Sequence, residues 1–288
     1  MAYILLILTT LFWSGNFVLS RGVNDLIPPI SLGFWRWFWA GVILLPFSFK
    51  YLKKDLKIIK ENIIYINIVG ILGVSLFNTL IYKAVHYTTA INAILINSFV
   101  PIIVLFFSLI IYKDKPNFKQ IIGIIISILG IINIILKGDL TKILELSFNK
   151  GDILVLLAAT DWALYTVLLK SIPRGLHPLS FLQSIVIFGV IYLLPFYIYE
   201  IHKFGTFPIN LKTTISILYV AIFASVIAFI FWNRAVKDIG ANNTAPFVHL
   251  MPVFGTIMAI VFLGEKLFLF QVIGILLVFI GILLATRR

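Results

Sequence analysis

The chain has 288 residues, of which 61% are apolar and 12% are charged. Soluble domains average about 45–50% apolar and about 25% charged residues, so this composition excludes an ordinary soluble domain and favours a protein embedded in lipid. The net charge of +12 does not indicate nucleic-acid binding, because Lys and Arg lie in short gaps between apolar runs, as in membrane proteins. The chain contains no cysteine, which excludes disulfides, thiolate chemistry and Cys-based metal sites.

Apolar segments long enough to cross a bilayer follow one another along the whole chain. A spanning helix requires about 20 consecutive apolar residues. The segments of that kind are residues 3–20, 29–49, 62–82, 88–111, 119–136, 152–170, 178–199, 213–233, 241–263 and 268–286. We therefore predict an all-α integral membrane protein with ten transmembrane helices.

The distribution of Lys and Arg sets the expected orientation. These residues are more frequent in the gaps that are cytoplasmic when the amino terminus is inside, and the basic run from 50 to 60 carries much of the difference. This bias predicts that both termini are cytoplasmic. No small-x-small pattern follows the first apolar segment, so we expect it to be retained as a helix. The expected location is the cytoplasmic membrane of a prokaryote.

The two halves of the chain resemble each other. Residues 82–131 align with residues 233–282 at an offset of 151, and the earlier helices align at an offset of 149. The pairs least expected by chance are Trp13/Trp162, Pro29/Pro178, Asn92/Asn243, Pro101/Pro252, Gln120/Gln271, Gly123/Gly274 and Gly130/Gly281. Each copy contains five helices, an odd number, so the second copy must enter the membrane from the opposite side. We predict two inverted five-helix repeats, 1–136 and 151–288, joined by a linker at 137–150; secondary transporters commonly have such repeats and bind solute between them.

Several short motifs resemble those of EamA-type proteins of the drug/metabolite transporter superfamily. They are Trp13-Ser14-Gly15-Asn16, the stretch 34–40 around Arg36, Tyr82-Lys83-Ala84, Trp162-Ala163-Leu164-Tyr165 and Leu263-Gly264-Glu265. The resemblance covers nearly the whole chain. It implies ten helices with cytoplasmic termini, a central cavity lined by helices 1, 3, 4, 6, 8 and 9, and metabolite transport, often amino acid export. It also implies subunit contacts through the fifth and tenth helices, so a homodimer is among the expected assemblies.

Polar and aromatic residues on the helices are the candidates for substrate binding. In lipid, such side chains tend to face the bundle interior or a water-filled cavity. The candidates are Trp13, Asn16, Asn78, Tyr82, Asn97, Asp161, Trp162, Tyr165, Trp232 and His249. Asp161 could bind a substrate amine or take up a proton, or it could form a structural hydrogen bond to a neighbouring helix. The imidazole of His249 could both donate to and accept from a substrate, with a packing role as the alternative.

Arg36 and two prolines have other expected roles. Arg36 lies inside the second helix, and we expect it to extend to the outer headgroups beside an interfacial belt of Trp35, Trp37 and Trp39. The alternative for Arg36 is a counter-charge for a substrate carboxylate. Pro101 and Pro252 are predicted to be symmetry-related bending points for gating, or else static kinks, because proline disrupts helical hydrogen bonding.

These observations predict a secondary transporter of small metabolites, with amino acids or related metabolites exported by alternating access at a central cavity. The expected partners are an amino-acid-like solute and the lipid bilayer, and not nucleic acid. No catalytic residue, cofactor or metal site is predicted, because the sequence has neither a phosphate-binding Gly-x-x-x-x-Gly-Lys-Ser/Thr motif nor a His-x-x-x-His pair. A membrane enzyme acting on lipid-type substrates, and a channel or scaffold subunit, remain the alternatives.

Overall fold

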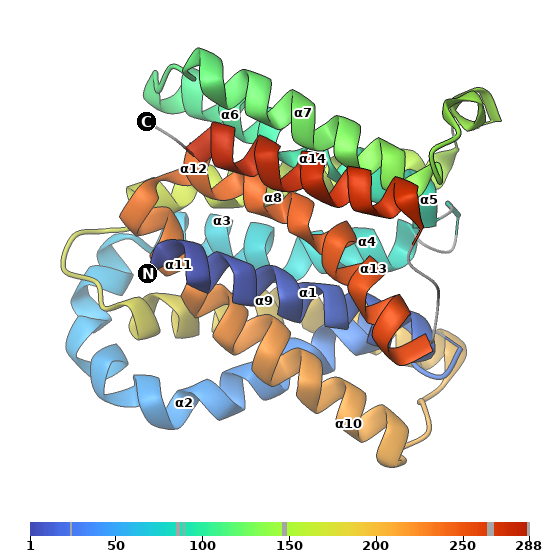
Figure 1. The fold of residues 1–288 in the computed structure, drawn as a ribbon. Coiled ribbons are helices and arrows are strands. Elements are labelled where there is room, and N and C mark those ends of the chain that lie inside the picture. Colours follow the sequence, from blue (N-terminus) through green and yellow to red (C-terminus); the bar gives the residue numbers. More distant parts are fainter. Residues whose placement is uncertain (24, 85–86, 89, 146–148, 264–267, 287–288) are drawn as a thin grey trace.

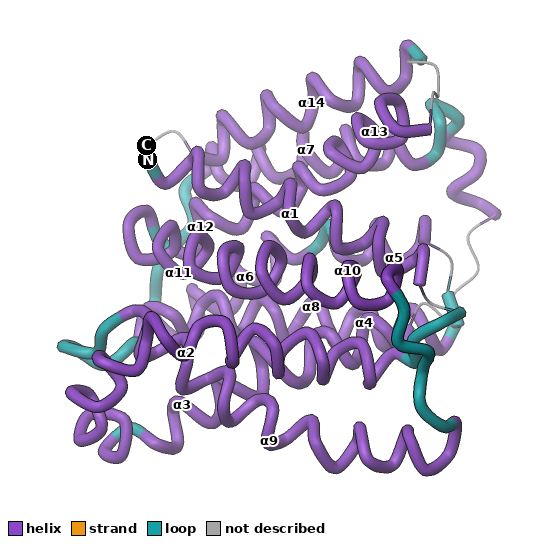
Figure 2. The backbone as a smooth tube through the Cα atoms, turned by 90° about the horizontal axis from the view of Figure 1, so that it is seen from below, coloured by secondary structure: helices purple, strands orange, loops and turns teal. Residues whose placement is uncertain are grey.

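The computed structural model describes residues 1–23, 25–84, 87–88, 90–145, 149–263 and 268–286, so Gly264 and Glu265 of the last motif lie outside it. In this part of the chain every regular element is a helix (Figures 1 and 2), which confirms the all-α class. Eight helical stretches there are long and apolar enough to cross a membrane. The first turn of α1 and the last turn of α14 lie at the same end of the bundle.

The helices follow the predicted apolar segments. In the first half they are α1 (Ala2–Val23), α2 (Pro29–Glu61), α3 (Ile63–Gly70), the π-helix η1 (Ile71–Leu76), α4 (Phe77–Ala84), α5 (Ala90–Asn97), α6 (Val100–Tyr112) and α7 (Phe118–Ile135). A 3₁₀ turn, η2 (Leu140–Glu145), lies in the predicted linker. In the second half they are α8 (Lys150–Leu168), the 3₁₀ turn η3 (Leu169–Ser171), α9 (Pro178–Phe204), α10 (Leu211–Tyr219), the π-helix η4 (Val220–Ile227), α11 (Ala228–Ile239), α12 (Ala241–Thr244), the 3₁₀ turn η5 (Ala245–His249), α13 (Leu250–Leu263) and α14 (Leu269–Thr286).

The basic run after the second apolar segment is helical and not a loop. Helix α2 continues to Glu61, although the apolar stretch ends near residue 49. Lys, Leu and Glu, which make up most of residues 50–61, are good helix formers and need no apolar surroundings to continue the helix. The predicted gap at 50–60 was therefore wrong as secondary structure.

Helices α2 and α9 run antiparallel and cap each other with acidic side chains. At one end of the pair, the Glu200 carboxylate accepts hydrogen bonds from the backbone N–H groups of Ile30 (3.1 Å) and Ser31 (2.6 Å) and from Ser31 Oγ (2.7 Å). At the other end, Asp55 Oδ2 accepts from the backbone N–H of His177 (2.9 Å), at the start of α9. A carboxylate at a helix N-terminus satisfies unpaired N–H groups and complements the helix dipole. The last turns of each helix therefore stabilise the first turn of its partner.

Helices α7 and α14 also run antiparallel, and glycine allows their backbones to touch. They lie side by side along their lengths (Figure 1). A Cβ atom on Gly123 would lie 2.4 Å from the carbonyl oxygen of Gly281, and one on Gly130 would lie 2.6 Å from that of Gly274. The close packing predicted at these glycines is thus observed between two helices of one chain. Subunit contact through the same helices stays a prediction.

Two of the predicted spanning helices are interrupted near their middle. Helix α5 ends at Asn97 and α6 begins at Val100, with Pro101 in its first turn. In the second half, η5 separates α12 from α13, and Pro252 lies in the first turn of α13. Each proline lies in the first turn of a helical segment, where its missing N–H is not needed. Bending or gating at these positions stays a prediction.

Candidate functional site

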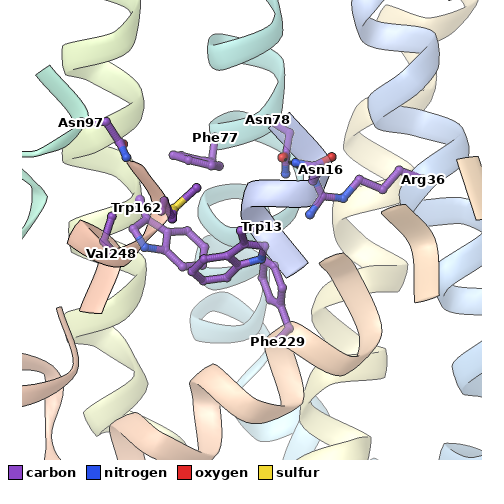
Figure 3. Close-up of a pocket in the computed structure, with 10 residues that line it drawn as sticks. Trp13, Asn16, Arg36, Phe77, Asn78, Asn97, Trp162, Phe229 and Val248 are labelled. Carbon is purple, nitrogen blue, oxygen red and sulfur yellow. Dashed lines mark hydrogen bonds between the residues drawn. The ribbon is translucent and has the colours of Figure 1, made fainter. Parts of the chain in front are cut away.

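A small cavity lies at the centre of the bundle, where the interrupted helices and the π-helical stretches approach one another. It is lined by Trp13, Asn16, Arg36, Phe77, Asn78, Asn97, Trp162, Phe229, Val248 and Met251 (Figure 3). Its volume is about 30 Å³. One water molecule needs roughly 10–15 Å³ measured in this way, so the cavity has room for about two or three waters and for no metabolite until side chains move.

The helix breaks and π-helical stretches place the lining residues. Asn97 ends α5 at one break, and Val248 lies in η5 at the other. These two breaks are joined, because His249 Nε2 donates to the carbonyl oxygen of Ser98 (2.8 Å). Phe77 directly follows η1, and Phe229 lies just after η4. Irregular helical turns of this kind free backbone groups and are frequent at functional sites.

Arg36 lies inside the protein, which contradicts the expected position at the headgroups. Its side chain is buried, with 2% of its surface exposed. Nε donates to Ser225 Oγ (2.6 Å), Nη1 donates to Asn78 Oδ1 (2.7 Å) and to Tyr82 Oη (3.2 Å), and Nη2 donates to the carbonyl oxygen of Ala224 (3.0 Å). Extension to the headgroups would forfeit these four contacts.

The neighbouring tryptophans do not form a uniform interfacial belt. Trp37 is completely buried and packs edge-on against Phe229, with ring centroids 4.8 Å apart. The guanidinium of Arg36 lies 5.1 Å from the Trp37 ring centroid, a cation–π distance. Trp35 donates to the hydroxyl of Tyr197 (2.9 Å) and only Trp39 is substantially exposed. The Trp37 ring therefore helps to hold the Arg36 guanidinium in place inside the protein.

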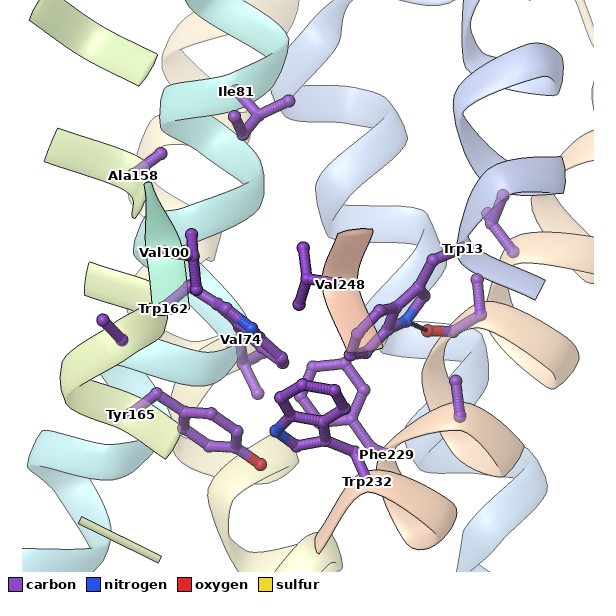
Figure 4. Packing of buried hydrophobic residues seen from close by; sticks show 14 of the residues in the cluster. Trp13, Val74, Ile81, Val100, Ala158, Trp162, Tyr165, Phe229, Trp232 and Val248 are labelled. Atoms are coloured by element: carbon purple, nitrogen blue, oxygen red, sulfur yellow. Dashed lines mark hydrogen bonds between the residues drawn. The ribbon is translucent and has the colours of Figure 1, made fainter. Parts of the chain in front are cut away.

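Aromatic rings form the apolar wall of the cavity (Figure 4). Trp13 and Trp162, which align in the two halves, meet edge to face with ring centroids 5.1 Å apart. Trp162 also contacts Phe77 (5.2 Å) and Phe229 (5.6 Å). The Trp13 indole N–H donates to the carbonyl oxygen of Ala224 (3.0 Å), so the ring orientation is fixed by the same carbonyl that accepts from Arg36.

The structure brings half of the predicted binding residues to the cavity. Those that line it are Trp13, Asn16, Asn78, Asn97 and Trp162. Tyr82 is not among the lining residues, but its hydroxyl accepts a hydrogen bond from Arg36, which lines the cavity. Tyr165 and Trp232 pack on the aromatic cluster, but their polar atoms bond away from it, to Asn233 Oδ1 (2.8 Å) and Thr166 Oγ1 (3.2 Å). Besides Arg36, the remaining lining residues are apolar: Phe77, Phe229, Val248 and Met251. Nothing in their spacing distinguishes them from lipid-facing or packing residues.

Asp161 and His249 lie outside the lining. His249 is fully buried, and both of its ring nitrogens form hydrogen bonds: Nε2 with the carbonyl oxygen of Ser98 and Nδ1 with Ser127 Oγ (2.6 Å). These bonds join α7 and the two helix breaks. Asp161, with 5% of its surface exposed, precedes Trp162 in α8. Neither of its carboxylate oxygens has a hydrogen-bond partner among the described residues. Of the two roles considered for Asp161, the structural hydrogen bond to a neighbouring helix is not seen among these residues.

Known proteins with similar sequences are transporters by name. The model of the EamA-like transporter family matches residues 1–136 and 149–287. The uncharacterized transporter YyaM of Bacillus subtilis (strain 168) is 30% identical, over 99% of this chain and 93% of its own length. An uncharacterized transporter of Archaeoglobus fulgidus is 28% identical, over 99% of this chain and 97% of its own length. A solved crystal structure that is 15% identical has the same fold, with a TM-score of 0.79 over 99% of this chain and 96% of that chain.

Proposed function

The chain belongs to the EamA-like transporter family, and on that premise we propose that it is a secondary transporter that moves small metabolites by alternating access at the central cavity. We propose further that ten helices cross the cytoplasmic membrane of a prokaryote, with both termini inside. The solutes are amino acids or related metabolites, and the direction is export.

The observation that carries this proposal is the composition of the cavity wall. Its residues come from the segment 1–136 and from the segment 149–287, each matched by the family model, and they meet at the two helix breaks. A site shared between two halves opens to one side or the other when the halves move relative to each other. The small volume of the cavity agrees with a closed stage of such a cycle.

The antiparallel pairs support an inverted relation between the halves. Helices α2 and α9 occupy aligned positions in the sequence, as do α7 and α14, and each pair runs antiparallel. Inversion also predicts that Lys54 and Lys142 lie on opposite sides of the membrane. The native chain has no cysteine, so single cysteines at exposed Lys54 and half-exposed Lys142 can be labelled from one side in intact vesicles. Labelling of both from the same side would contradict the inverted arrangement.

Flux through purified protein tests the function itself. The protein is reconstituted into liposomes loaded with a panel of labelled amino acids, organic acids, amines and neutral metabolites. We expect saturable flux of at least one of these solutes without ATP. This flux should be lost in Trp162→Ala, because the change removes the ring that contacts Trp13, Phe77 and Phe229 in the cavity wall. Flux that never saturates would indicate a channel, and no flux of any solute from correctly folded protein would contradict transport.

A further inference from the structure

The polar end of the cavity carries a positive charge with no anion beside it. All the hydrogen-bond partners of the Arg36 guanidinium are neutral: two hydroxyls, one amide oxygen and one backbone carbonyl. A buried cation is expensive unless a counter-charge accompanies it. The dipoles around Arg36 reduce that cost without cancelling the charge, so the cavity presents a net positive end.

The same end has more hydrogen-bond donors than acceptors. A guanidinium can only donate, so the Asn78 amide must turn its oxygen toward Arg36 and its nitrogen away. That nitrogen, in a side chain with only 4% of its surface exposed, has no hydrogen-bond partner among the described residues. One of the two N–H bonds of Arg36 Nη2 is likewise without an acceptor there. Two unused donors beside a cation match the oxygens of an anion.

The rest of the cavity is apolar or neutral. In Figure 3, Arg36, Asn16 and Asn78 lie on one side of Trp13 and Trp162, and Asn97 lies on the other. None of the lining residues is acidic. A solute ammonium would therefore find aromatic rings and an amide in the lining, and no carboxylate.

The sequence alignment of the two halves shows that the polar residues at the Arg36 end of the cavity have no polar counterparts of the same kind in the second half. Asn16 and Arg36 align with Tyr165 and Ile185 at the offset of 149, and Asn78 aligns with Phe229 when the offset of 151 is extended back by four residues. The first half thus supplies the charged end, and the aligned residues of the second half are aromatic or aliphatic. An amphipathic solute fits a cavity with such ends.

We infer that the transported solute is held by an anionic carboxylate at Arg36 and Asn78, with its apolar body against Trp13 and Trp162, and that an ammonium group on the solute is not required. This inference rests on the proposed transport function and narrows its substrate class. The carboxylate oxygens accept from Asn78 Nδ2 and from the unused N–H of Arg36 Nη2. Monocarboxylates with an apolar body therefore bind at least as well as the corresponding amino acids.

Binding to the full-length protein in detergent separates the chemical classes. The probes share one apolar body and differ in the head group: 3-phenylpropionate, 3-phenylpropionamide, 3-phenylpropylamine and phenylalanine. The readouts are ligand-induced thermal stabilisation and quenching of intrinsic tryptophan fluorescence, since Trp13 and Trp162 line the cavity. We expect saturable binding of 3-phenylpropionate and phenylalanine. The amide and the amine should bind at least about tenfold more weakly, the effect of losing a charge-assisted hydrogen bond.

The variant Asn78→Asp tests the site with little risk of unfolding. Asp has nearly the shape of Asn, still accepts from Arg36 and supplies the missing counter-charge, so the melting temperature should stay the same or rise. It also removes the free donor, so the affinity for 3-phenylpropionate should fall about tenfold or more. The control Asn210→Asp makes the same chemical change at an exposed helix N-cap, where Asp caps as well as Asn, and should leave affinity unchanged.

The outcomes distinguish the site from the function. The inference is overturned if 3-phenylpropionate does not bind saturably, if the amide or amine binds as tightly, or if Asn78→Asp leaves its affinity unchanged. Liposome flux of amines or neutral solutes alone would also overturn it and would leave transport standing. Carboxylate binding that depends on Asn78, without flux of any solute, would support the site and contradict the transport function.

Discussion

At the residue scale, two buried charged side chains, Arg36 and Asp161, differ in how their hydrogen-bonding groups are satisfied. Arg36 has four neutral hydrogen-bond partners, whereas the carboxylate oxygens of Asp161 have none among the described residues. Unpaired buried polar groups are rare because each costs free energy. Where one persists within a membrane segment, a functional role is the default hypothesis.

The substitution Asp161→Asn should separate stability from function. It replaces a carboxylate without partners by a neutral amide of similar shape, so the free energy of unfolding should rise by on the order of 1 kcal/mol. Transport should be impaired or should change its dependence on pH. The measurements are the melting temperature in detergent and liposome flux over a range of pH.

Asp152→Asn provides the contrast, because the carboxylate of Asp152 accepts several hydrogen bonds. It accepts from the backbone N–H of Asn149 (2.8 Å) and from Asn92 Nδ2 (3.2 Å), and it bonds the hydroxyl of Thr88. This variant should lose stability. Normal flux at every pH in Asp161→Asn would exclude a transport role for Asp161.

Sequence reasoning reached the cavity residues that combine polarity with helical spacing, such as Asn16, Asn78 and Trp13. It placed Arg36 wrongly, because its environment is made by residues far along the chain: Asn78 is 42 positions away and Ser225 is 189 away. Periodicity within one helix shows which face is polar. It does not show which other helix meets that face, and that contact decides whether a guanidinium is buried.

At the element scale, the reciprocal caps of α2 and α9 make one acidic side chain important for stability. Glu200→Gln keeps the shape but loses the charge that faces three donors, so the free energy of unfolding should fall by about 1–3 kcal/mol. The control is Glu61→Gln, since Glu61 is exposed and forms only a 4.0 Å pair with Lys57. Such surface pairs contribute about 0–1 kcal/mol. Equal melting temperatures for the two variants would contradict this role of Glu200.

The prolines at the two helix breaks should affect rate more than stability. Pro101 and Pro252 lie in the first turns of α6 and α13, where alanine is also accepted. Alanine would, however, allow the helix to continue through the break, which changes how the segment can bend. We expect Pro101→Ala and Pro252→Ala each to slow flux severalfold at wild-type expression and melting temperature. Unchanged flux in both variants would show that the breaks are static.

At the scale of the whole molecule, the contact between α7 and α14 depends on the absence of side chains. In Gly281→Ala, the new methyl group would lie 2.4 Å from the carbonyl oxygen of Gly123 and 2.6 Å from the backbone nitrogen of Ser127. The helices must then separate, at a cost of about 1–3 kcal/mol. Gly255→Ala is the matched control, because a Cβ atom there meets nothing within 4 Å. A melting temperature that falls equally in both variants, or in neither, would contradict this packing.

The apolar segments of the sequence predicted the helices well, because a helix in lipid must satisfy its own backbone hydrogen bonds along an apolar stretch. The extension of α2 to Glu61 and the breaks before Pro101 and Pro252 were not predicted. Hydropathy records the preference of side chains for lipid, which ends near residue 49 and continues unbroken through both prolines. Where a helix stops or restarts inside a protein depends on tertiary contacts such as the one between His249 and Ser98.

That contact has a mechanical consequence. The imidazole of His249 belongs to one interrupted helix, and the carbonyl of Ser98 belongs to the other. Neither interrupted helix can move here unless the other moves with it or the hydrogen bond between them breaks. The two interruptions are therefore coupled through this buried hydrogen bond, and moving one of them independently requires the bond to break.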